Sequence, residues 1–97
     1  MNPEKWKKLS FAEQMGNIGS EFFRMVNLKQ KGDVENSKDS FLRFLDLIDL
    51  TITQRKNVEL LRLREVVCDL FLGENIYRVS IGSLKRYFLQ FALLANK

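Results

Sequence analysis

Apolar residues recur at intervals of three and four positions along most of the chain, the spacing that places side chains on one face of an α-helix. Between residues 10 and 31 the repeating apolar positions are Phe11, Met15, Ile18, Phe22, Met25 and Val26. Ser10 and Glu13 have the spacing of a capping box, which predicts that this helix begins at Ser10. Lys29 and Lys31, followed by Gly32, predict that it ends near residue 31.

Three further segments have the same helical spacing, and we expect helices over residues 33–52, 56–72 and 83–95. Their inward positions are Val34, Phe41, Phe44, Leu45, Ile48 and Ile52, then Leu60, Leu63, Val67, Leu70 and Phe71, then Leu84, Phe88, Phe91 and Ala95. Asp33 is suited to cap the first of these helices, and Ser80 or Ser83 the last. Four amphipathic segments with short connections predict an all-α fold, an up-down-up-down four-helix bundle that forms one domain over residues 1–97.

Two glycines lie beside the apolar stripe of the first predicted helix. Gly16 and Gly19 each lower the stability of a helix by about 1 kcal/mol relative to alanine. We therefore expect a neighbouring helix to approach the first one closely at these positions.

The chain carries more apolar residues than these inward stripes use. A bundle helix needs about three apolar residues in seven, and the surplus consists of Leu42, Leu47 and Leu50, of Leu61, Cys68 and Leu72, and of Leu89 and Leu93. Isolated leucines on a surface are normal, whereas a contiguous apolar surface indicates a partner. We favour the second interpretation and expect the leucines to form the interface of a homo-oligomer, by default a dimer. A different protein partner is the alternative.

Three ionisable residues fall at or beside the inward stripes. Arg64 lies among inward positions of the third helix, Asp49 borders the stripe of the second and Glu21 that of the first. A buried guanidinium requires a charged partner, so we predict a buried polar network in which Arg64 pairs with Asp49 or Glu21. The network either fixes the register of the helices or forms a recognition site.

Basic residues interleaved with aromatic ones suit contact with nucleic acid, because they combine phosphate binding with base stacking. The candidates are Lys5, Trp6, Lys7 and Lys8 near the N-terminus, and Arg78, Lys85 and Arg86 near and within the fourth helix. The net charge of +4 is mild for such a role. Trp6 has a second interpretation, in which it folds over the end of the bundle.

The remaining chemistry argues against an enzyme. The sequence has no histidine, which excludes Ser-His-Asp and Cys-His catalysis within one chain, and it has no phosphate-binding glycine motif. Asp46 and Asp49 form only a weak candidate for a shared metal ion, so we expect no metal and no cofactor. The single cysteine, Cys68, suits a reducing compartment, and the longest apolar runs are too short to span a membrane. We expect a cytoplasmic protein.

The segments 9–21, 45–52 and 61–67 resemble a small, uncharacterised bacterial family of four-helix bundles. That family is similar in plan to the proteins encoded in ribosomal RNA intervening sequences and to the accessory variability protein of diversity-generating retroelements. The resemblance implies an oligomer that contacts RNA or a reverse transcriptase. The plan is also similar to that of the HEPN superfamily, whose ribonuclease motif requires a histidine that this sequence lacks.

These observations predict a non-catalytic helical-bundle subunit that self-associates and serves as a binding or accessory protein. The alternative is an RNA-binding accessory protein that uses the basic N-terminal and fourth-helix surfaces. A third interpretation is an antitoxin-like or regulatory partner of an enzyme.

Overall fold

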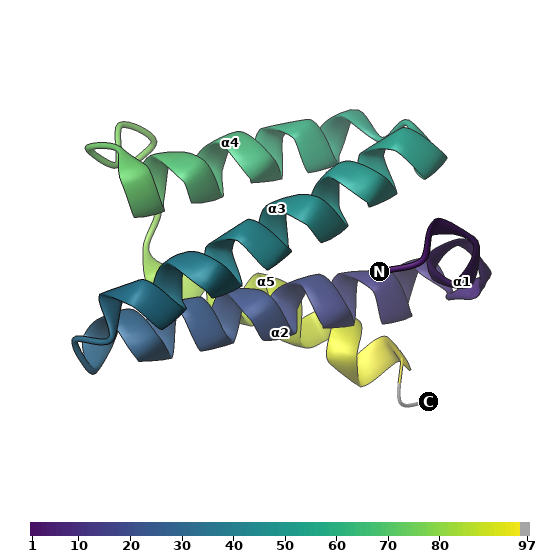
Figure 1. Ribbon diagram of the computed structural model, residues 1–97. Coiled ribbons are helices and arrows are strands. Elements are labelled where there is room, and N and C mark those ends of the chain that lie inside the picture. The colour runs from purple at the N-terminus through teal and green to yellow at the C-terminus, as the bar shows by residue number, and fades with distance from the viewer. Residues whose placement is uncertain (96–97) are drawn as a thin grey trace.

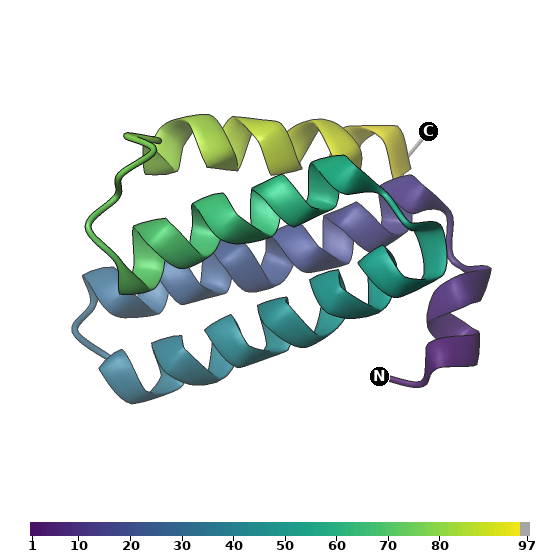
Figure 2. The ribbon, with the colours of Figure 1, turned by 90° about the horizontal axis from the view of Figure 1, so that it is seen from above.

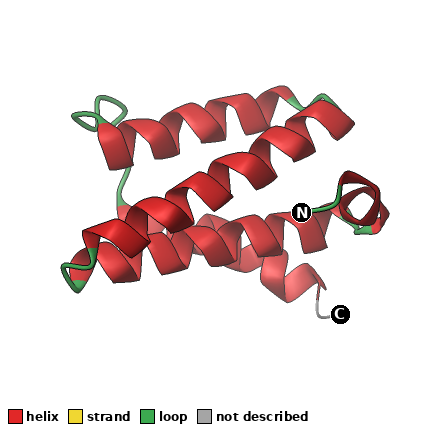
Figure 3. Ribbon diagram, in the orientation of Figure 1, coloured by secondary structure: helices red, strands yellow, loops and turns green. Residues whose placement is uncertain are grey.

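The computed structural model describes residues 1–95, and within that range it consists of helices and their connections, with no strand (Figure 3). The helices are α1 (Pro3–Lys8), α2 (Phe11–Gln30), α3 (Val34–Arg55), α4 (Val58–Leu72) and α5 (Ile81–Ala95). The all-α prediction is confirmed. The short helix α1 was not predicted, because a single inward side chain, Trp6, gives no repeating pattern.

The ends of the helices are fixed by side chains close to them in sequence. The predicted capping box is present, since Ser10 N donates to Glu13 Oε1 at 3.0 Å and Glu13 N donates to Ser10 Oγ at 3.1 Å. The hydrogen bond from the Ser10 backbone, with a further contribution from the Ser10 side chain, lowers the pKa of Glu13. Gly32 has a φ of +82°, which allows the tight turn between α2 and α3. The helix α3 ends at Arg55, beyond the predicted residue 52, and Lys56 follows it in the left-handed conformation.

Helix α2 lies between α3 and α5 and packs along both of them (Figures 1 and 2). Helix α4 lies beside α3, and a connection over residues 73–80 leads from its end to α5. The view from above shows α1 at one end of the molecule and this connection at the other (Figure 2). Lys5, Lys7 and Lys8 therefore lie at the end that carries α1, and Arg78 lies at the end that carries the connection.

The core is centred on α2 and its two neighbours. The fully buried aromatic side chains of Phe22, Phe44 and Phe88 come from α2, α3 and α5. Their ring centroids are 5.2 Å apart for Phe22 and Phe88 and 6.4 Å apart for Phe44 and Phe88. Such pairs add about 0.5–1.5 kcal/mol each beyond the burial of their surface.

The close approach expected at the glycines occurs at Gly19. A Cβ atom added to Gly19 would lie 2.7 Å from Cβ of Phe88 on α5, so no larger residue fits without a shift. Gly16 is less constrained, because the nearest atom to an added Cβ is Cα of Ala92 at 4.0 Å. The predicted close approach of a neighbouring helix is therefore confirmed at Gly19, and at Gly16 the neighbouring helix is farther away.

Helix α1 is held against the end of α3 by buried polar contacts. Trp6 is completely buried, and its Nε1 donates to Thr51 Oγ1 at 2.8 Å. Gln14, also buried, donates from Nε2 to the carbonyl oxygen of Trp6 at 2.7 Å and accepts from Arg55 Nε at 2.6 Å. The tryptophan thus folds over the end of the helices, which confirms the second interpretation of Trp6 given by the sequence.

Candidate functional site

Arg64 and Asp49 form an ion pair between α4 and α3. Arg64 Nε lies 2.6 Å from Asp49 Oδ1, and Nη2 lies 3.4 Å from Oδ2. This hydrogen bond raises the pKa of Arg64. The side chains are 37% and 50% exposed, so the prediction that the pair is buried is wrong. Arg64 lies toward the outer side of the α3–α4 contact, where its long side chain keeps the guanidinium in water.

Glu21 does not belong to that pair. It lies on α2, where Arg43 Nε of α3 is 3.4 Å from Glu21 Oε2 and Arg24 Nη1 is 3.7 Å from Oε1. The three residues predicted as one network therefore form two separate surface clusters. Buried polar contacts instead join Trp6, Gln14 and Thr51, and no spacing rule pointed to the last two residues.

The seven leucines predicted at an oligomer interface differ in exposure. Leu42, Leu61, Leu72, Leu89 and Leu93 are exposed. Leu47 and Leu50 are partly buried against the core, so they are wrong as members of an open interface. Both leucines line a surface depression together with Glu21 and Arg43.

The exposed leucines lie on two sides of the molecule. Leu42 and Leu72 each follow one member of the stacked pair Phe41 and Phe71, whose rings are 4.5 Å apart, so both border the α3–α4 contact. Leu89 is four residues after Lys85, whose ammonium lies 5.8 Å from the ring of Phe23 on α2. Leu89 and Leu93 thus belong to the α2–α5 side and do not continue the α3–α4 surface.

The predicted basic residues do not form one surface. Lys5, Lys7 and Lys8 are exposed on α1, at one end of the molecule, and Arg78 lies in the connection at the other end (Figure 2). Trp6 is removed from the candidate contacts, because a completely buried indole cannot stack on a base. Trp6 lies between lysines in the sequence because it is the one residue of the short helix α1 that faces inward, whereas the lysines face solvent.

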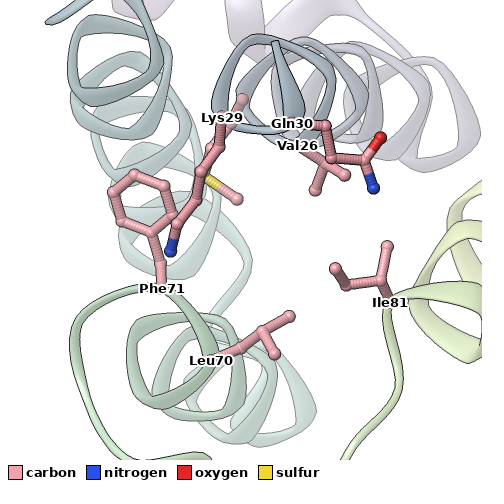
Figure 4. Close-up of a pocket in the computed structure, with 7 residues that line it drawn as sticks. Val26, Lys29, Gln30, Leu70, Phe71 and Ile81 are labelled. Atoms are coloured by element: carbon pink, nitrogen blue, oxygen red, sulfur yellow. The ribbon is translucent and has the colours of Figure 1, made fainter. Parts of the chain in front are cut away.

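An apolar pocket opens where the ends of α2 and α4 meet the start of α5 (Figure 4). Its volume is about 250 Å³, and its lining consists of Met25, Val26, Lys29, Gln30, Leu70, Phe71 and Ile81. The Lys29 ammonium lies 4.8 Å from the centre of the Phe71 ring, a cation–π distance. Sequence reasoning placed Leu70 and Phe71 inward but could not show that α5 leaves the space beside them open.

Tyr87 and Cys68 are the two remaining groups with perturbed acidity. Burial raises the pKa of Tyr87 to about 12, and the nearby Glu59, whose Oε1 is 3.5 Å from the hydroxyl, adds to this effect. Burial also raises the pKa of the Cys68 thiol, against the opposing effect of Arg64. A raised thiol pKa lowers the fraction of reactive thiolate.

Within residues 1–95 no group of three or more aspartate, glutamate or cysteine side chains is placed to hold a metal ion. None of the helices in that range is long and apolar enough to cross a membrane. No model of a known protein family matches the chain, and no curated protein or solved structure matches it either. The resemblance described above therefore stays a prediction.

Proposed function

We propose that this protein is a non-catalytic binding or accessory subunit, an up-down-up-down bundle of α2 to α5 that self-associates through the outer face of α4. The observation that carries this proposal is the exposure of the apolar side chains on that helix. Val58, Leu61 and Leu72 are 76%, 48% and 69% exposed. Contiguous exposed apolar surface is uncommon on proteins that act as monomers.

The spacing on α4 suits contact with a second helix. Val58, Leu61, Cys68 and Leu72 follow one another at the three- and four-residue steps of a heptad seam, interrupted by Glu65 in the middle. Leu42 on α3 is exposed as well. In an isologous dimer each α4 presents the same residues to the other, so one patch supplies both halves of the interface.

The experiment is light scattering after size-exclusion chromatography on the wild type and two variants. We expect the wild type to exceed the monomer mass of 11.4 kDa and Leu61→Glu/Leu72→Glu to return to it. Leu93→Glu is the matched control, because Leu93 is 62% exposed but lies on the other side of the molecule. A monomeric wild type, or an equal effect of Leu93→Glu, would contradict the proposal.

A second candidate function is RNA binding by the end of the molecule that carries α1. The supporting observation is that the exposed Lys5, Lys7 and Lys8 share this end with the exposed Lys56, since α1 is hydrogen-bonded to the end of α3. Each phosphate contact that is lost reduces the dependence of binding on salt. Lys7→Ala/Lys8→Ala should therefore lower both the RNA affinity and its salt slope, whereas Lys85→Ala/Arg86→Ala should change them less. Absence of salt-dependent RNA binding would remove this candidate.

A further inference from the structure

The pocket between α2, α4 and α5 combines an apolar interior with two polar side chains of α2, Lys29 and Gln30, at its edge. Met25 and Val26 are buried at its base, and Leu70, Phe71 and Ile81 are partly buried around it. Figure 4 shows Leu70 and Ile81 facing Val26 across the opening. A dry apolar cavity of about 150 Å³ is large enough for benzene. This pocket, at about 250 Å³, has room for a larger apolar body.

The two polar side chains are exposed, and neither the Lys29 ammonium nor the Gln30 side-chain amide has an ion pair or a side-chain hydrogen bond among residues 1–95. The Lys29 ammonium lies over the face of Phe71. An ammonium offers three donors and an amide offers two more. Figure 4 shows the Lys29 ammonium beside Phe71 on one side of the opening and the Gln30 amide turned away on the other, and no acidic side chain lines the pocket.

We propose that this pocket binds a small carboxylic acid with an apolar body of about eight carbons, a size consistent with the cavity volume. The apolar body lies against Val26, Leu70 and Ile81, and the carboxylate accepts a hydrogen bond from the Lys29 ammonium. The pocket favours the acid over a neutral molecule of the same length, because the Lys29 ammonium attracts the carboxylate. No acidic side chain in the lining competes for that ammonium. The site is separate from the outer face of α4 and does not depend on self-association.

The test compares octanoate with octanol by NMR, following the methyl signals of Val26, Leu70 and Ile81 during titration. We expect octanoate to shift these signals and to bind at least about fivefold more tightly than octanol, since a hydrogen bond between charged groups is the stronger kind. Methyl signals that do not move with octanoate would overturn the proposal. Equal binding of the two compounds would also overturn it, because the carboxylate would then contribute nothing.

Two lysine variants test whether Lys29 causes the preference for octanoate over octanol. Lys29 is exposed, so Lys29→Gln should fold normally, and it should abolish the preference for octanoate while octanol binding stays within twofold of the wild type. Lys31→Gln removes the same charge just beyond the end of α2, outside the pocket, and should keep the preference. A preference that survives Lys29→Gln would contradict the assignment. Light scattering on the same samples should show an unchanged oligomeric state, which separates this proposal from the self-association of α4.

Discussion

The two sides of helix α3 differ in how completely they are packed. On the side of α2, side chains as large as Phe22 and Phe44 are fully buried, and beyond α2 a glycine allows α5 to approach within van der Waals contact. On the side of α4, the buried residues of that helix are Leu60, Leu63 and Val67, and the helix borders an open pocket. Close packing concentrates buried side chains around α2, whereas apolar side chains of α4 stay exposed.

The largest loss of stability is expected from a substitution on the closely packed side of α3, toward α2. Phe44→Ala should lower the free energy of unfolding by about 3–5 kcal/mol, because it removes a fully buried ring between α3 and its neighbours. Phe71→Ala on α4 removes a partly buried ring and should cost less than half as much. Urea denaturation followed by circular dichroism measures both. Equal losses would mean that α4 is as tightly integrated as α2.

The two glycines of α2 test how closely α5 packs against α2, because replacing either glycine with alanine adds one methyl group. Gly19→Ala should lower the free energy of unfolding by about 1–3 kcal/mol, since its Cβ would overlap with Phe88. Gly16→Ala meets no such atom and should raise it by up to about 1 kcal/mol through helix propensity. Thermal and urea denaturation of the two variants should therefore shift in opposite directions. Stabilisation by both would show that α5 moves away from α2 easily.

The contact of α5 with α4 should depend on alkaline pH. The pKa of Tyr87 is about 12 in the folded protein against an ordinary value of 10.0, so the unfolded chain loses this proton first. The contribution to stability is complete below pH 10.0 and is lost as pH rises toward about 12. Urea midpoints across this window should fall more for the wild type than for Tyr87→Phe. Tyr77→Phe serves as the control, and an identical fall in Tyr87→Phe would contradict the assignment.

The smallest effect is expected at the ion pair between α3 and α4. A double-mutant cycle with Arg64→Ala and Asp49→Ala should give a coupling of about 0.2–1 kcal/mol, because both side chains are more than one-third exposed. Breaking a buried pair would cost about 3–5 kcal/mol. Urea denaturation at low and high salt measures the coupling, which should decrease with salt. A salt-independent coupling above that range would show that the pair is shielded from solvent.

The features that were predictable from the sequence are those set by neighbouring residues. The capping box of Ser10 and Glu13 and most inward positions of the long helices depend on spacing along one helix, which the sequence displays directly. Val34 and Ala95 were predicted to face inward and are exposed, because each lies at a helix end, beyond the neighbouring helices. The exposure of Arg64 and the separation of Glu21 from it depend on how far each helix is rotated against the next. An angular projection around one helix carries no information about that rotation.

The candidate site was predicted less well than the fold for the same reason. The apolar residues of the pocket were identified as inward, but the opening depends on the distance between α4 and α5. The residues that fix α1 were missed because Gln14 and Thr51 are ordinary surface types that are buried here only through contacts far apart in sequence. Trp6 was the one residue whose size alone indicated such a contact.

The burial of Trp6 makes the protein its own optical reporter. It is the only tryptophan in the chain, and its indole is excluded from water and hydrogen-bonded to α3. Detachment of α1 would transfer the fluorophore from an apolar to an aqueous surrounding and shift its emission to longer wavelength, while the four long helices kept their circular dichroism. A shift that precedes the loss of helicity would thus reveal a partly unfolded state in which only the N-terminal segment is released.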